Sequence, residues 1–238
     1  MRDGEIDEVL KNAAAAERAP EIGASLLRRV SDSIQPSMRR VRPLPRTWVL
    51  AGGVVLICAG VALAEAARAG FNGFEKMDLL ERALIFAMLG ILAWVAGTEF
   101  ANEMIPGSRR RITAYWLLGI GSVVLVGVFA LLFHDYHADR FVSVGVICLV
   151  TGVLHAIPAG LLSWLVLRRG FAVNSVSAGL VAGTLAGLAG VGLLELHCPN
   201  FQAIHILVWH TAVLVVSGGL GALVGRALQF RKRLRRVP

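Results

Sequence analysis

Cys198 and its neighbour His197 carry the most readily named chemistry in this sequence. They precede Pro199 at the end of a long apolar run, and His205 follows a few residues later. Thiolate and imidazole groups are both metal ligands, and the thiolate is also a redox group. A protonated imidazole lowers the pKa of a neighbouring thiol. The sequence therefore predicts a redox or metal-sensing site at these residues, with ordinary polar loop residues as the alternative.

A second group of polar residues lies in the segment HDYHADR, between two apolar runs. His134 and His137 belong to it, together with Asp135 and Asp139. Their spacing only suggests a metal site, and a polar loop without special chemistry is the alternative. The other cysteines, Cys58 and Cys148, fall within apolar runs. We therefore expect no unstrained disulfide between Cys198 and either of them, and we expect no cofactor.

Two further histidines, His155 and His210, lie within apolar runs, where an ionisable side chain is costly and is a functional candidate by default. A haem held by both is disfavoured. Counted from the outer ends of their helices, His155 lies about 21 Å deep and His210 about 9 Å deep, at ~1.5 Å per residue. We expect both to be neutral histidines that are hydrogen-bonded between helices.

The helices that must position these residues follow from composition. Apolar residues make up 56% of the 238-residue chain and charged residues 17%, which predicts a membrane protein. About 20 apolar residues cross ~30 Å of hydrocarbon. Six runs qualify, so we predict an all-α, polytopic, six-helix transmembrane bundle. The runs are Trp48–Ala69, Ala83–Phe100, Tyr115–Phe133, Phe141–Leu167, Val176–Leu196 and Ile204–Leu228.

Basic residues give the orientation of the bundle. Clusters of Arg and Lys precede the first run, join the second to the third and the fourth to the fifth, and follow the sixth. Basic residues collect on the cytoplasmic side of short loops. Both termini are therefore predicted to be cytoplasmic, in a bacterial inner membrane. Trp48, Trp116 and Trp164 fall at the cytoplasmic ends of their runs, which agrees with this orientation.

Small residues predict how the last two helices pack. Gly179, Gly183 and Gly187 repeat every four residues in the fifth run, and Gly221 and Gly225 do so in the sixth. Such faces let helix backbones approach closely in lipid. We expect these two helices to be close neighbours. A proline within the fourth run, Pro158, predicts a local kink.

The polar segment 1–46 precedes the transmembrane domain, 47–230, and a basic tail, 231–238, follows it. Apolar residues at helical spacing in segment 1–46 predict two short amphipathic helices, one on each side of Pro20. These helices are too small to bury a core, so their apolar stripes need a partner protein, the membrane surface or each other. A disordered arm is the alternative. The candidate partner-binding residues are Ile6, Val9, Leu10, Leu26, Leu27 and Val30.

The sequence argues against several functional classes. It contains no phosphate loop, HExxH or GxSxG motif, so we expect no enzyme. We also expect no direct binding of nucleic acid, and no small-molecule substrate is evident. A small six-span transporter or channel remains the alternative function. Against it, the runs lack paired carboxylates or a mid-bilayer arginine, and no inverted repeat is evident.

The stretch from Glu195 to Arg226 reads ELHCPNFQAIHILVWHTAVLVVSGGLGALVGR. Its Leu-His-Cys-Pro turn, tryptophan and glycine-rich end resemble the last part of the NrsF-type family of membrane anti-sigma factors, the negative regulators of sigma F. The six runs and the polar head also match in layout. The resemblance implies an inner-membrane protein that binds an extracytoplasmic-function sigma factor through residues 1–46. It would regulate transcription in a stress response by releasing that factor on an envelope stimulus, either redox or heavy metal.

The resemblance also implies a second outer cysteine, and the loop HDYHADR contains none. An intrachain dithiol switch is therefore not expected at that loop. Either His134 and His137 replace the second thiolate in a metal site, or the stimulus differs.

Overall fold

The computed structural model describes residues 45–105, 108, 112–170, 172 and 174–234, with residues 8, 28, 29 and 32 of the head. Side chains are described as far as residue 230. The chain divides into two units, Met1–Pro43 and Leu44–Pro238. The six candidate partner-binding residues, from Ile6 to Val30, lie outside the described residues, so those assignments stay predictions.

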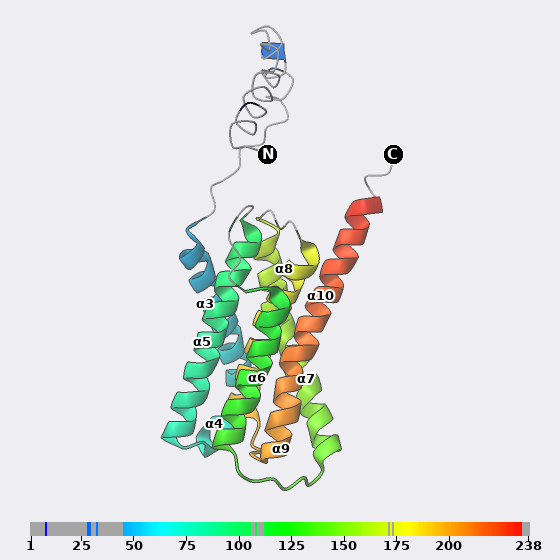
Figure 1. Cartoon of the computed structure of the whole chain (residues 1–238). Helices are drawn as coiled ribbons and strands as arrows, with labels where there is room; N and C mark the ends of the chain where they lie inside the picture. Colours follow the sequence, from blue (N-terminus) through cyan, green and yellow to red (C-terminus); the bar gives the residue numbers. More distant parts are fainter. Residues whose placement is uncertain are drawn as a thin grey trace. The chain divides into compact units, whose positions relative to one another are not determined.

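Six helices of the second unit are long and apolar enough to cross a membrane, which confirms the predicted all-α fold. The first five are α3 (Thr47–Ala69), α5 (Leu79–Met104), α6 (Ala114–Leu132), α7 (Phe141–Leu167) and α8 (Ser175–His197). The sixth, Ala203–Phe230, joins α9 (Ala203–His205), a π-helical turn η2 (Ile206–His210) and the start of α10 (Thr211–Leu234). A short helix, α4 (Asn72–Lys76), follows α3. Figure 1 shows these helices as one bundle.

Helix α5 is longer than the predicted run Ala83–Phe100 because polar residues cap its start. The Asp78 side chain accepts a hydrogen bond from the Glu81 backbone N–H at 2.7 Å, and the Glu81 carboxylate accepts one from the Asp78 N–H at 2.9 Å. This capping box satisfies two backbone donors that have no partner within the helix. At the other end, the helix continues through Glu99 and Glu103, whose side chains are buried.

Helix α8 occupies the interior of the bundle, and the other five long helices surround it. Nearly every α8 residue from Ser177 to Leu196 is buried. The surrounding helices instead expose large apolar side chains, including Leu56, Ile91, Val123, Ile147 and Leu223. A soluble protein would leave such side chains in water at a cost of about 1.5–3 kcal/mol each relative to burial. The arrangement is compatible with a multi-pass membrane protein.

The glycines of α8 and α10 lie at the contact between these two helices. A Cβ atom added to Gly179 would collide with the Gly221 carbonyl oxygen, and one added to Gly221 would lie 2.9 Å from the Gly183 Cα. An added Cβ on Gly187 would lie 2.9 Å from the Leu214 Cα, and one on Gly225 would collide with the Ser175 carbonyl oxygen. No larger residue fits these positions without separating the backbones.

The π-helical turn η2 was not predicted from the sequence. Five residues of an α-helix turn through about 500°, so positions 205 and 210 would diverge by ~140°. Hydrogen bonds between residues five apart, which define a π-turn, instead stack such positions on one side. The turn therefore brings His205 and His210 to the same face of the sixth helix, with ring centroids 5.5 Å apart.

Candidate functional site

Three connecting segments meet at one end of the bundle, the end opposite the C-terminal part of α10 (Figure 1). The Ala203 N–H donates to the Asp135 carbonyl oxygen at 2.6 Å, which joins the segment after α6 to the start of α9. Lys76 Nζ donates to the Pro199 carbonyl oxygen at 3.3 Å. Gly73 packs so closely on the end of α8 that an added Cβ would lie 2.7 Å from the carbonyl oxygens of Glu195 and Cys198. These contacts fix the segment that contains Cys198.

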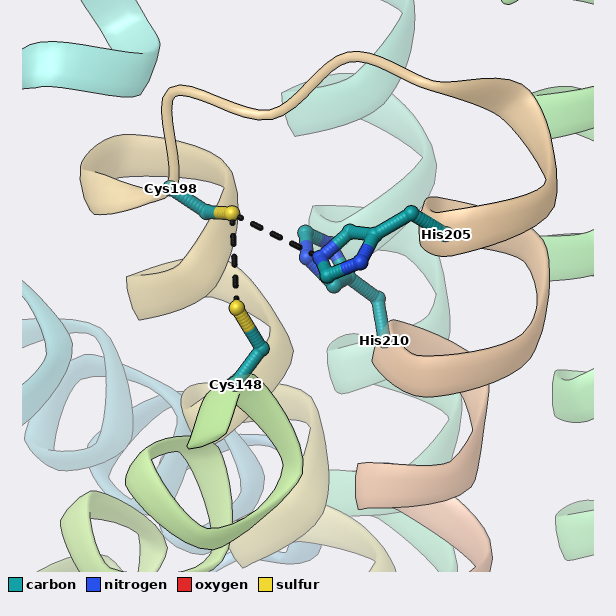
Figure 2. A group of neighbouring side chains, drawn as sticks. All are labelled: Cys148, Cys198, His205 and His210. Carbon is teal, nitrogen blue, oxygen red and sulfur yellow. Dashed lines mark hydrogen bonds between the residues drawn. The ribbon is translucent and has the colours of Figure 1, made fainter. Parts of the chain in front are cut away.

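Four side chains of types that can bind metals converge just inside this end of the bundle (Figure 2): Cys148, Cys198, His205 and His210. The Cys148 and Cys198 Sγ atoms are 3.6 Å apart, and the Cys198 Sγ is 3.7 Å from His205 Nε2. One ligand atom from each of the four residues lies within 4.8 Å of those of the other three. We call this group the Cys–His cluster.

Each member of the Cys–His cluster comes from a different part of the fold. Cys148 lies in the first third of α7. Cys198 caps the C-terminus of α8, where its N–H donates to the Leu194 carbonyl oxygen at 2.7 Å, and Pro199 prevents the helix from continuing. His205 ends α9, and His210 ends η2. The four side chains are therefore close together only while α7, α8 and the sixth helix keep these relative positions.

A buried carboxylate holds one histidine of the cluster. His210 Nδ1 donates to Glu195 Oε1 at 2.6 Å, and both side chains are about 1% exposed. Within the described part of the chain, neither His210 Nε2 nor His205 Nδ1 has a hydrogen-bond partner, although both atoms are buried. A buried polar atom without a partner costs about 1–3 kcal/mol. Such an atom calls for an explanation.

Two kinds of chemistry are open to this arrangement. Two thiols that are almost in contact can be oxidised to a disulfide if the sulfur atoms approach to about 2.05 Å. Two thiolates and two imidazoles can also bind a metal ion of intermediate softness. Both reactions use the same two sulfur atoms, so they exclude each other.

Cys148 and His210 are the residues of the cluster that sequence reasoning missed. The sequence predicts no unstrained disulfide between Cys148 and Cys198, and the structure places their sulfur atoms 3.6 Å apart, much closer than that prediction implies. A second cysteine therefore lies beside Cys198, in α7 instead of the loop before it. The depth of Cys148 within its predicted helix is a sequence signal that could have indicated this position. Cys148 lies about 10 Å along α7 from Phe141, close to the ~9 Å expected for His210.

Three histidines proposed as sensing residues lie apart from the cluster. His197 is directed to the segment after α3, where its Nδ1 donates to the Gly70 carbonyl oxygen at 3.2 Å. His134 is exposed. His137 is also exposed, and its Nδ1 donates to Asp135 Oδ1 at 2.5 Å. Of the five predicted sensing residues, the structure brings together only Cys198 and His205.

The Asp135 carboxylate raises the pKa of His137, chiefly through this hydrogen bond and then through its charge. In return, the hydrogen bond with His137 lowers the pKa of Asp135. The pair is a local feature of an exposed loop.

His155 and His210 are both hydrogen-bonded, at separate places. His155 Nδ1 donates to the Thr151 carbonyl oxygen one turn earlier in α7, at 2.8 Å, and its Nε2 lies 3.6 Å from Glu65 Oε2 of α3. His210 instead bonds Glu195 of α8. The two histidines therefore have separate hydrogen-bond partners.

Comparison with known proteins gives one match. The family model described as "NrsF: Negative regulator of sigma F" matches residues 31–229. No curated protein and no solved structure matches the chain. The matched region contains the first five long helices, the sixth as far as residue 229, and every member of the Cys–His cluster. It extends well beyond the stretch 195–226 that carries the resemblance in the sequence. The chain belongs to the NrsF family, the negative regulators of sigma F.

Proposed function

We propose that this protein is a membrane-anchored anti-sigma factor. It binds an extracytoplasmic-function sigma factor through residues 1–46, holds it at the bacterial inner membrane, and releases it when the Cys–His cluster meets an oxidant or a heavy metal. The observation that carries the proposal is the family match over residues 31–229 in a chain with six apolar helices. Its role is regulation by binding, and no catalytic step is needed.

The proposed orientation rests on the even number of membrane crossings and on the distribution of basic residues. In this proposal all six helices cross, so the start of α3 and the end of α10 lie on the same side of the membrane. In the sequence, basic clusters precede the first span, join the second to the third and the fourth to the fifth, and follow the sixth, so the positive-inside rule assigns that side to the cytoplasm. The Cys–His cluster then lies near the outer surface. A single cysteine placed at Asn200 should react with a membrane-impermeant reagent in intact cells, and one placed at Ser108 should not. Labelling at Ser108 would contradict this orientation.

The stimulus is proposed to act on the two thiols of the cluster. A peroxide that accepts two electrons and two protons from Cys148 and Cys198 leaves a disulfide and is itself reduced. The sulfur atoms must then move roughly 1.5 Å closer than they are now. Because one sulfur belongs to α7 and the other to the end of α8, this movement shifts α8 against α7. The glycine contacts of α8 with α10 would carry that shift towards the cytoplasmic side.

Binding of the sigma factor is tested with the full-length chain. Leu27→Glu places a charge on the apolar stripe of the head and should remove a buried side chain worth about 1.5–3 kcal/mol, or roughly 10- to 100-fold in affinity. The measurement is co-purification of the sigma factor from detergent-solubilised membranes, together with transcription of its target genes. Ser25→Glu, on the opposite face of the same predicted helix, is the matched control. If Leu27→Glu retains normal binding, the stripe does not face the sigma factor.

Sensing is tested separately from binding. Cys198→Ser and Cys148→Ser should each abolish or lock the transcriptional response to oxidant or Cd²⁺, while the protein still inserts and still binds the sigma factor. Cys58→Ser is the control, because Cys58 lies in α3 and outside the cluster. A normal response of the Cys198→Ser protein would reduce this cysteine to a structural residue, and His134 and His137 would be the next candidates.

A further inference from the structure

We propose that the Cys–His cluster is a built metal site that binds one thiophilic divalent ion, of the class of Zn²⁺ or Cd²⁺. Its ligands are Cys148, Cys198, His205 and His210, and Glu195 acts as the outer partner that holds His210. The regulatory meaning of this site rests on the function proposed above. The binding itself does not, because it is a property of the chain without a sigma factor.

The spacing of the ligand atoms fits a tetrahedral ion. Metal–sulfur distances of about 2.3 Å and metal–nitrogen distances of about 2.0–2.1 Å place two sulfurs about 3.8 Å apart, and a sulfur and a nitrogen about 3.6 Å apart. The Cys148 and Cys198 sulfurs are 3.6 Å apart, and the Cys198 sulfur lies 3.7 Å from His205 Nε2. An ion can therefore enter between these atoms with small side-chain adjustments.

The contact between His210 and Glu195 points to the same conclusion independently. A carboxylate that accepts the Nδ1–H of a histidine fixes the tautomer in which Nε2 carries the free lone pair. In His210 this Nε2 atom is buried and has no partner within the described part of the chain. A purely structural pair between His210 and Glu195 would explain the Nδ1 contact but would leave Nε2 unsatisfied. A metal ion explains both nitrogens.

The donor set selects the class of ion. Two thiolates and two neutral imidazoles suit Zn²⁺ and its softer relative Cd²⁺, whereas Mg²⁺ and Ca²⁺ require oxygen ligands. Two thiolates neutralise the divalent ion itself in a site whose histidines are about 1% exposed, and the Glu195 carboxylate accepts the hydrogen bond of His210 beside it. Forming the site from thiols releases two protons for each ion that binds: M²⁺ and two R–SH give M(SR)₂ and two H⁺.

The proposal is tested on the full-length chain, purified in detergent micelles with its thiols reduced and without added sigma factor. Titration with CdCl₂ and with ZnCl₂ should give one ion per chain, with two protons released per ion. MgCl₂ should give no binding. For Cd²⁺, the ultraviolet absorption of cadmium–thiolate bonds should rise in step with occupancy.

Variants separate the ligands from their surroundings. Cys148→Ser, Cys198→Ser, His205→Ala and His210→Ala should each weaken binding at least tenfold. Glu195→Gln keeps all four ligands and should weaken it about 10- to 100-fold, as loss of an outer partner does. Cys58→Ser and His137→Ala are the matched controls and should bind like the unchanged chain. Gel filtration and helical circular dichroism identify the variants that fold. If an alanine variant does not fold, the near-isosteric serine and glutamine variants still test the proposal.

Two results would overturn the proposal. The first is the absence of Cd²⁺ and Zn²⁺ binding by a folded chain with reduced thiols. The second is normal affinity in both histidine variants, which would leave a simple dithiol. Because the assay contains no sigma factor, a chain that binds the ion but not a sigma factor would refute the proposed function alone. A chain that binds a sigma factor but no ion would refute the metal site alone.

Discussion

Among the described residues, two carboxylate–histidine pairs have almost the same contact distance in opposite surroundings. Glu195 and His210 meet at 2.6 Å with about 1% of each side chain exposed, whereas Asp135 and His137 meet at 2.5 Å with 56% and 83% exposed. In the exposed pair, water solvates each polar atom that the partner leaves free. In the buried pair, each atom must find its partner within the protein. Residue type alone therefore says little about these histidines, and position in the fold decides their role.

Glu195 belongs to α8, and His210 lies in the π-turn directly before α10. The largest expected effect comes from the contact between α8 and α10. In Gly221→Ala, the added Cβ would lie 2.9 Å from the Gly183 Cα and would collide with the Gly179 carbonyl oxygen. We expect a loss of about 2–3 kcal/mol in the free energy of unfolding, since overpacking typically costs about 1–3 kcal/mol. The measurement is the thermal unfolding midpoint in detergent micelles.

Gly219→Ala is the matched control, two residues away in the same helix. A Cβ added there meets nothing within 4 Å. Replacing a helical glycine by alanine then contributes only its helix propensity, a gain of up to about 1 kcal/mol. Opposite signs in the two variants would identify the α8–α10 contact as the cause. Equal effects would mean that the two helices are not in contact at these glycines.

The second-largest expected effect comes from a direct comparison of the two carboxylate–histidine pairs. Glu195→Ala leaves both ring nitrogens of His210 without a protein partner in a buried site and should lower the free energy of unfolding by about 1–3 kcal/mol. Asp135→Ala removes the same kind of contact at the surface, where water solvates the histidine that is left, and should change it much less. Both are measured by thermal unfolding of the metal-free protein in micelles. Similar losses in the two variants would show that burial does not separate the pairs.

The sequence predicted the helices well because a membrane span needs a long apolar run, and each run is a local property. The contact between α8 and α10 was also expected, since Gly183 and Gly221 belong to regular patterns within single helices. The Cys–His cluster was only half predicted. Cys148 joins it through tertiary packing of α7 against the end of α8, and His210 joins through a π-turn that breaks the helical periodicity on which sequence reading depends. The partner-binding stripe of the head lies outside the described residues.

The smallest effect is the titration of the exposed pair. Asp135 raises the pKa of His137 above its ordinary value of 6.5. The protonated pair therefore stabilises the loop fully below pH 6.5, and this contribution is lost as the pH rises through the raised pKa of His137. On the acid side, the pKa of Asp135 is lowered from 3.8, so the contribution is present above pH 3.8 and is lost as the pH falls through the lowered value. The pair should thus be most effective between these limits.

The test is an NMR titration of histidine-labelled protein in micelles, with His137 assigned by the signal that disappears in His137→Ala. Its midpoint should lie above 6.5 in the unchanged chain and should fall in Asp135→Asn, which removes the charge and weakens the hydrogen bond. Asp139→Asn should lower it less, because Asp139 raises the pKa of His137 only through its charge and by the smallest amount. A midpoint at or below 6.5 in the unchanged chain would show that solvent screens the pair completely. An unchanged midpoint in Asp135→Asn would show that another group sets the titration of His137, and the comparison with the buried pair would then lose its exposed member.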